Sequence, residues 1–171
     1  NAYNGMAVVY DKQGEYARAL ELYAKALAIY EQVHGEGHSD TAGVYNNMAG
    51  VLDSQGKLDE AMEMYQKALA IKIKALGPDH SSVGDTYNNM ALVYYSQGKC
   101  EEALESYAKA LEIRIAALSD KHPDVGRTYY SMASVYNKQG KEDLSLDCYK
   151  KALAIRRAAL GDRLAQVRLS E

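Results

Sequence analysis

Residues 85–126 read DTYNNMALVYYSQGKCEEALESYAKALEIRIAALSDKHPDVG. Apolar side chains at the spacing i, i+3, i+4 and i+7 predict one face of a helix, and they are Tyr87, Met90, Ala91 and Tyr94. We expect Gly98 to end this helix, because glycine tolerates the left-handed backbone conformation found past many helix ends. A second periodic run, residues 103–118, predicts a second helix, which the segment 119–123 interrupts. The stretch therefore predicts a helical hairpin followed by a short loop.

The same pattern recurs along the chain at a constant step, the one that leads from Tyr45 to Tyr87. The motif of residues 87–91 has counterparts at residues 3–7, 45–49 and 129–133. The step equals six heptads, but a Gln-Gly pair follows each copy and excludes one continuous coiled coil. Because one hairpin cannot bury its own apolar face, neighbouring hairpins must stack and share an elongated core. The predicted fold class is an all-α solenoid of stacked antiparallel helix pairs.

The composition restricts the class of protein. The 171 residues are 25% charged and 47% hydrophobic, with a formal net charge of −3, which is ordinary for a globular chain. A reader of nucleic acid or of a membrane surface would be markedly basic, and no apolar run reaches the roughly 18 residues of a transmembrane helix. Two cysteines are too few for a disulfide scaffold. We therefore expect a cytoplasmic protein with no nucleic-acid or membrane partner.

Seven side chains keep their register from repeat to repeat. In residues 85–126 they are Tyr87, Met90, Ala91, Tyr94, Ala103, Tyr107 and Ala110, and in the first repeat they are Tyr3, Met6, Ala7, Tyr10, Ala19, Tyr23 and Ala26. The second and fourth repeats depart from this pattern at Leu52 and Ser145. The pattern resembles the tetratricopeptide repeat, whose common form has about 34 residues. The longer second helix and the loop at residues 76–80 resemble the repeats of the kinesin light chain.

This resemblance implies a right-handed superhelical solenoid whose concave groove binds peptide segments of other proteins, with no catalysis and no cofactor. We expect a single array over residues 1–171, with repeats at about residues 1–42, 43–84, 85–126 and 127–168. Residues 161–171 align with the loop and the opening of a truncated fifth repeat, so we expect a loop after residue 160. Because neither end carries an obviously polar capping helix, we expect exposed apolar surface at both ends and a tendency to self-stack end to end.

The asparagines of the first helices are the main candidates for peptide binding. The family's pattern places Asn46, Asn47, Asn88 and Asn89 on the groove. A carboxamide carries two donors and an acceptor, so a row of them can hold the backbone of an extended peptide without reading its sequence. The alternative is that these side chains only solvate the helix surface or bond to the neighbouring hairpin. Weaker candidates for groove contacts are Asn4, Tyr95, Tyr130 and Asp53.

The histidines and cysteines carry no catalytic or metal-binding pattern. His38, His80 and His122 recur once per repeat, and a whole hairpin between neighbours is too far for shared ligation of one ion. We interpret them as residues at helix starts. No histidine lies near either cysteine in the repeat geometry to act as a base, and no phosphate-binding or metalloprotease motif is present. We therefore predict that the chain is not an enzyme and binds no metal.

Two alternatives to peptide binding stay open. The similarity between repeats fits an architectural spacer, because identical grooves offer little specificity. The chain equally fits a regulatory sensor arm of a larger multidomain protein, such as a signalling ATPase. Absence of any preference in a peptide library would favour the spacer, whereas the sensor arm can be tested only with the flanking sequence.

Overall fold

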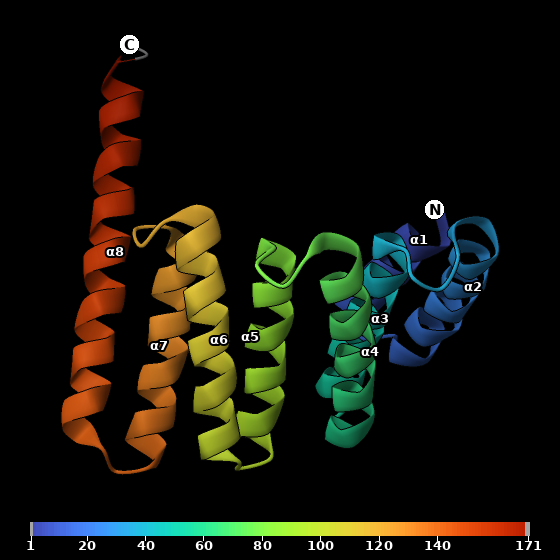
Figure 1. The fold of residues 1–171 in the computed structure, drawn as a ribbon, viewed down its shortest axis with the longest axis horizontal. Coiled ribbons are helices and arrows are strands. Elements are labelled where there is room, and N and C mark those ends of the chain that lie inside the picture. Colours follow the sequence, from blue (N-terminus) through green and yellow to red (C-terminus); the bar gives the residue numbers. More distant parts are fainter. Residues whose placement is uncertain (1, 170–171) are drawn as a thin grey trace.

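The computed structural model describes the backbone of residues 2–169 and the side chains of residues 2–161. Over these residues the chain forms helices and no strands, and the helices pair in chain order into four hairpins (Figure 1). The helices are α1 (Ala2–Lys12), α2 (Tyr16–His34), α3 (Ser39–Ser54), α4 (Leu58–Leu76), α5 (Ser81–Ser96), α6 (Cys100–Leu118), α7 (Pro123–Lys138) and α8 (Glu142–Leu169). The predicted all-α solenoid of stacked helix pairs is confirmed.

The turn inside each hairpin is built on the Gln-Gly pair. The four glycines have φ between 72° and 78°, in the left-handed region, and they are Gly14, Gly56, Gly98 and Gly140. In the third hairpin the N–H of Gly98 donates to the carbonyl oxygen of Tyr95 at 3.0 Å, and the N–H of Lys99 donates to that of Tyr94 at 2.9 Å. These bonds satisfy carbonyl groups at the end of α5 and reverse the chain, so that α6 packs back along α5.

The recurring histidines begin the first helices of the second, third and fourth hairpins. The Nδ1 atoms of His38, His80 and His122 each accept a hydrogen bond of 3.2 Å from the backbone N–H two residues further along. Each imidazole therefore caps a helix N-terminus, a role that serine, aspartate or asparagine usually fills. The interpretation of these histidines as helix-start residues is confirmed.

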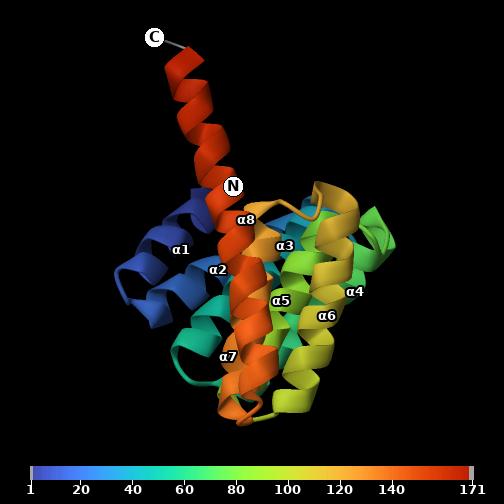
Figure 2. The same cartoon turned by 90° about the vertical axis from the view of Figure 1, so that its left-hand side faces the viewer.

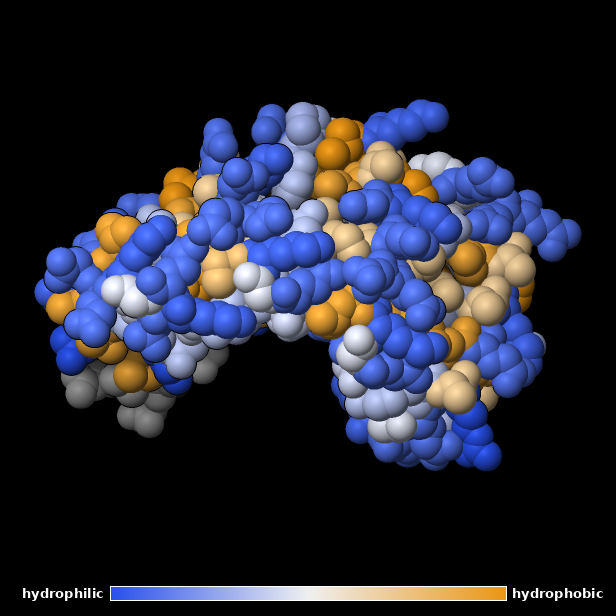
Figure 3. All heavy atoms as spheres, turned by 90° about the horizontal axis from the view of Figure 1, so that it is seen from below, coloured by the Kyte–Doolittle hydropathy of each residue, from blue (hydrophilic) through white to orange (hydrophobic). Residues whose placement is uncertain are grey.

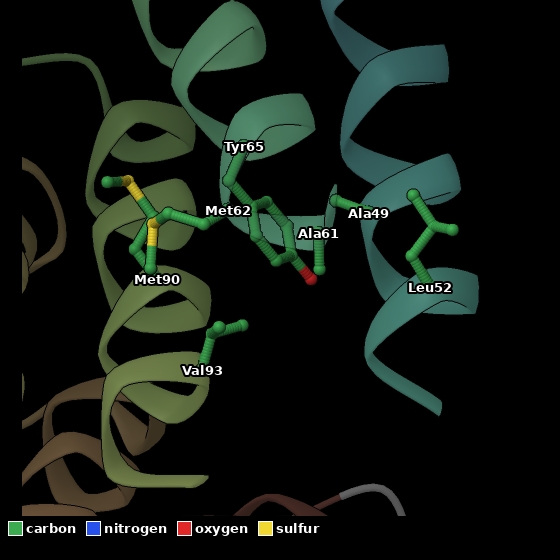
Figure 4. Close-up of a cluster of buried hydrophobic side chains, with 7 residues drawn as sticks. All are labelled: Ala49, Leu52, Ala61, Met62, Tyr65, Met90 and Val93. Carbon is green, nitrogen blue, oxygen red and sulfur yellow. The ribbon is translucent and has the colours of Figure 1, made fainter. Parts of the chain in front are cut away.

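Neighbouring hairpins share one core. Figure 4 shows a buried cluster that joins α3 and α4 of the second hairpin to α5 of the third; its members are Ala49, Leu52, Ala61, Met62, Tyr65, Met90 and Val93. All seven side chains are at most 8% exposed. Full burial of a large apolar side chain contributes about 1.5–3 kcal/mol. Because part of this burial comes from the next hairpin, the stability of one repeat depends on its neighbour.

The junction between the second and third hairpins contains a buried cation, which the sequence pattern did not predict. Lys72 Nζ of α4 donates to the Thr86 hydroxyl of α5 at 2.8 Å and to the carbonyl oxygen of Ser82 at 3.2 Å. Burial lowers the pKa of Lys72 below the ordinary value for lysine. Arg114 takes the same place one repeat later, and the half-buried Tyr30 takes it one repeat earlier. The three junctions therefore have a different side chain, Tyr, Lys or Arg, at the same position of the repeat.

The stacked hairpins curve into an arch. The first helices of successive hairpins contact one another, α1 with α3 and α3 with α5, so they line the inner side of the curve. Figure 2 shows α1 and α2 turned relative to α5 and α6, and Figure 3 shows a hollow on one side of the molecule between its two ends. We call this inner side, formed by α1, α3, α5 and α7, the groove.

The last helix differs from the expected end of a repeat. The second helices of the first two hairpins end at Gly35 and Gly77, where a positive φ turns the chain back. Gly161 lacks a positive φ, and the backbone stays helical to Leu169, projecting past the other helices (Figures 1 and 2). The loop expected after residue 160 is thus absent from the described backbone. Residues 170–171 lie outside the described residues, and the assignment of residues 161–171 to a fifth repeat stays a prediction.

Candidate peptide-binding groove

The structure brings two of the predicted asparagines together across neighbouring hairpins. Asn47 Nδ2 of α3 donates to Asn4 Oδ1 of α1 at 3.4 Å, which is long for a hydrogen bond and therefore weak. Both side chains are half-buried. The first two hairpins thus start a row of carboxamides that runs along the groove from one first helix to the next.

The equivalent pair one repeat later, Asn46 and Asn89, is open. Asn46 Oδ1 is buried and accepts no hydrogen bond from any described residue, and no described residue bonds to the Asn89 side chain. Leaving a buried polar atom unpaired costs about 1–3 kcal/mol, and such atoms are few in folded proteins. This pair therefore holds an unused acceptor and unused donors in the middle of the array.

Asn88 has a different environment from the other asparagines. Arg114 Nη1 of α6 donates to Asn88 Oδ1 at 3.0 Å and to the Thr128 hydroxyl of α7 at 2.7 Å, and Arg114 Nη2 lies 2.7 Å from the carboxylate of Asp85. The Arg114 side chain is 3% exposed, whereas that of Asp85 is 54% exposed. Asn88 is thus bonded to Arg114 of its own hairpin, and Arg114 in turn bonds to α7 of the fourth hairpin.

Reading the sequence alone missed Arg114 and Lys72, because charged residues on amphipathic helices usually face solvent. A signal was nevertheless present. Lys72 precedes Thr86 by the same distance along the chain as Arg114 precedes Thr128. At the junction between the first and second repeats the two corresponding places are taken by Tyr30 and Val44. At two of the three junctions a cation and a threonine hydroxyl occur together, and at the remaining one neither is present. This joint change indicates that the two side chains contact each other.

The predicted contact residue Asp53 lies half-buried on α3. Burial raises the pKa of its carboxyl above the ordinary value for aspartate, and no cation of the described residues forms an ion pair with it. Its counterpart one repeat later, Tyr95, packs against Lys138 of α7, whose Nζ lies 4.5 Å from the ring centroid and donates to the Tyr95 carbonyl oxygen at 3.2 Å. The structure thus commits Tyr95 to an internal contact and leaves Asp53 uncompensated.

Tyr130 lies at the last hairpin, with 59% of its surface exposed. Its ring packs edge-on against Tyr149 of α8, with the two centroids 5.2 Å apart. Both rings line a hollow of about 780 Å³ between α7 and α8, together with Arg127 and Arg156. Tyr130 is therefore reachable, but it belongs to the hollow of the last hairpin and not to the row of asparagines.

The described side chains give no sign of a metal centre or a membrane segment. They contain no group of three His, Cys, Asp or Glu residues placed to hold a metal ion. None of the described helices is both long enough and apolar enough to cross a bilayer.

The family model of the tetratricopeptide repeat matches residues 1–74, 40–116 and 82–158. The chain belongs to the tetratricopeptide repeat family. The overlapping matches cover each of the four hairpins, in agreement with the register read from residues 85–126. Comparison with curated protein sequences finds no match.

Solved structures of similar fold were found. BtubC (BKLC) from P. vanneervenii is 28% identical, with a TM-score of 0.85 over 93% of this chain and 63% of BtubC. A putative kinesin light chain from Podosopora anserina, with nearly identical TPR-like repeats, is 22% identical, with a TM-score of 0.74 over 92% and 74% of the two chains. The apo form of RapI is 20% identical, with a TM-score of 0.78 over 90% and 41%. The last two show the fold alone.

These comparisons assign the chain to a general class. Tetratricopeptide arrays are protein-interaction scaffolds, and the family is typically non-catalytic. The resemblance of the lengthened repeats to those of the kinesin light chain is also confirmed. The chain spans 63% of the length of BtubC.

Proposed function

We propose that the chain binds an extended peptide segment of another protein in its groove, mainly through the backbone of that peptide. The observation that carries this proposal is the open pair formed by Asn46 and Asn89. Asn46 Oδ1 is buried without a hydrogen bond, while the preceding pair, Asn4 and Asn47, is joined only by a contact of 3.4 Å. On turning into the groove, the half-buried Asn46 side chain would accept from a peptide N–H through its Oδ1, and the carboxamide N–H groups would donate to peptide carbonyl groups.

The row suits an extended backbone better than a folded partner. An extended strand presents N–H and C=O groups on both sides, with about 3.3 Å between successive residues. Because carboxamides bind these groups and not the side chains, the row alone gives affinity with little sequence preference. We expect modest affinity, since the peptide loses conformational entropy when it becomes ordered.

Selection of a random-peptide display library against the chain tests this proposal. The matched variant carries Asn46→Ala and Asn89→Ala, which remove the open pair and leave the bond of Asn88 to Arg114 in place. We expect the unaltered chain to enrich particular peptides from the library. We expect the double variant to enrich none of them. A chain that enriches nothing would instead support the architectural spacer, or the regulatory arm of a larger protein such as a signalling ATPase.

Both cysteines are buried and free, which supports a reducing compartment, and we infer that the protein works in the cytoplasm.

A second candidate role, self-association end to end, is favoured by the exposure of apolar residues at both ends of the array. In α1, Met6 is 48% exposed and Val9 is 53% exposed, whereas their counterparts in α5, Met90 and Val93, are 7% and 0% exposed. In the interior these positions pack against the preceding hairpin. We call the exposed Met6 and Val9 side chains the α1 ridge. In self-association, the α1 ridge of a second copy would fill the hollow between α7 and α8.

A further inference from the structure

The second hairpin differs from the others at one place in the groove. Gly50 of α3 stands where the other repeats have Val8, Leu92 and Ser134. A Cβ atom on Gly50 would lie 3.8 Å from the Tyr65 hydroxyl and within 4 Å of nothing else. Figure 4 shows the Tyr65 ring extending from α4 towards α3, with the hydroxyl at its far end. The missing side chain therefore leaves the way to this hydroxyl open from the groove.

The Tyr65 hydroxyl is an unused polar group. The residue is only 4% exposed, and its hydroxyl forms no hydrogen bond with any described residue. Burial raises the pKa of Tyr65 above its ordinary value, with a contribution from the nearby Asp53 carboxylate. In the fourth hairpin the equivalent hydroxyl, of Tyr149, lies 3.5 Å from the Ser134 hydroxyl. The Tyr65 hydroxyl has no such partner among the described residues.

Two further unused acceptors flank Gly50 on the same face of α3. Asn46, Gly50 and Asp53 follow the spacing i, i+4 and i+7, which places them in one line along a helix. Asn46 Oδ1 is buried without a partner, and the half-buried Asp53 carboxylate has no ion pair within the described chain. The Tyr65 hydroxyl thus borders the space that a side chain at position 50 would fill, and Asp53 lies about one turn further along the same face of α3.

We propose that this place is a subsite for a cationic side chain, Lys or Arg, of the bound peptide. This inference rests on the proposed peptide binding. An ammonium or guanidinium group can donate to the Tyr65 hydroxyl, and its charge offsets that of Asp53. An anionic side chain would be repelled by Asp53, and an apolar one would leave the Tyr65 hydroxyl and the Asp53 carboxylate without a partner. The groove therefore selects for one basic side chain of the peptide, while the asparagines bind the peptide backbone on either side of that residue.

The test compares four forms of the chain in the same random-peptide selection. They are the unaltered chain, Asp53→Asn, Gly50→Val, and Asp11→Asn as the matched control. Asp11 is the counterpart of Asp53 in the first repeat, where Val8 stands in place of Gly50. The Cβ atom of a valine at position 50 would lie at an ordinary contact distance from the Tyr65 hydroxyl, and the first repeat carries Val8 at this place, so this variant is expected to fold.

We expect peptides enriched on the unaltered chain and on Asp11→Asn to share a Lys or Arg at one fixed position. That preference should disappear on Asp53→Asn and on Gly50→Val. For a synthetic enriched peptide, replacing its basic residue by norleucine should weaken binding about tenfold on the unaltered chain and leave binding to Asp53→Asn unchanged. Enriched peptides without a fixed basic residue would overturn the subsite and leave the proposed function standing. A library that yields no enrichment at all would overturn both.

Discussion

The ammonium group of Lys72 donates a hydrogen bond of 2.8 Å to the hydroxyl of Thr86 across the junction between the second and third hairpins. One repeat earlier the same two places are taken by Tyr30 and Val44. One junction is thus built around a buried cation and another without charge, so the chain provides its own control.

Replacing Thr86 by Val removes the hydroxyl and leaves Lys72 with the carbonyl oxygen of Ser82 alone. We expect this single change to lower the free energy of unfolding by about 1–3 kcal/mol, because a buried charged donor loses an acceptor. Adding Lys72→Tyr recreates the pair Tyr30 and Val44 and should recover most of the loss. Urea denaturation of both variants measures this. A double variant no more stable than the single one would contradict the pairing of the two residues.

Alkaline pH should destabilise the fold through its buried tyrosines. Burial raises the pKa of Tyr23 and of Tyr107 to about 12, whereas the unfolded value is about 10. Below pH 10 both states keep these protons. Between pH 10 and 12 the unfolded state loses them first, so each tyrosine lowers the free energy of unfolding by up to about 1.4 kcal/mol per pH unit. Lys72, with its lowered pKa, opposes this trend only below about pH 10.5.

Urea denaturation between pH 9.5 and 11.5 measures this dependence. Tyr107→Phe should reduce the slope, while the control Tyr130→Phe, at an exposed side chain, should leave it unchanged. An unaltered slope in Tyr107→Phe would contradict the assignment.

The histidine caps should be replaceable by ordinary capping residues. His80→Ala removes the acceptor for the N–H of Ser82, and we expect a loss of about 0.5–2 kcal/mol in the free energy of unfolding. His80→Asp supplies a new acceptor and should keep most of the stability. Chemical denaturation at neutral pH distinguishes the two. If aspartate destabilised the fold as much as alanine, His80 would have a role other than capping.

Exposed apolar residues at the two ends should make the chain associate. Sedimentation velocity over a range of concentrations should show dimers and longer species, and Met6→Glu with Val9→Glu should abolish them by placing charge on the α1 ridge. Leu92→Glu is the control, because Leu92 is also exposed, at 41%, but lies on α5 in the middle of the array. A chain that stays monomeric at every concentration tested would refute end-to-end association.

The fold was predictable because its signals are local and repeated. The spacing of Tyr87, Met90 and Ala91 defines a helix face, and Gly98 stops the helix with no help from distant residues. The loop expected after residue 160 was wrong. Gly161 resembles Gly35 and Gly77 in sequence, but a glycine only permits a turn, and in the described structure no further hairpin packs beyond α8.

The candidate site was predictable only in part, because its residues are distinguished by contacts between hairpins. From the sequence, Asn46 and Asn88 look equivalent. In the structure Arg114 donates a hydrogen bond to Asn88 Oδ1, whereas Lys72, one repeat earlier, has no hydrogen bond to Asn46. The open hydroxyl of Tyr65 depends on a side chain that is missing from the other helix of its hairpin, at Gly50. A comparison of equivalent positions in the four repeats would have singled out Gly50, because the other three repeats carry a side chain there.

The central claim is that the open pair of asparagines holds a peptide by its backbone. Isothermal titration calorimetry of one enriched peptide against the unaltered chain and against the variant with Asn46→Ala and Asn89→Ala tests it most directly. We predict that the double variant binds at least about tenfold more weakly, with its free energy of unfolding unchanged or raised, because a buried unpaired carbonyl is removed. Equal affinity for the two forms would contradict the claim.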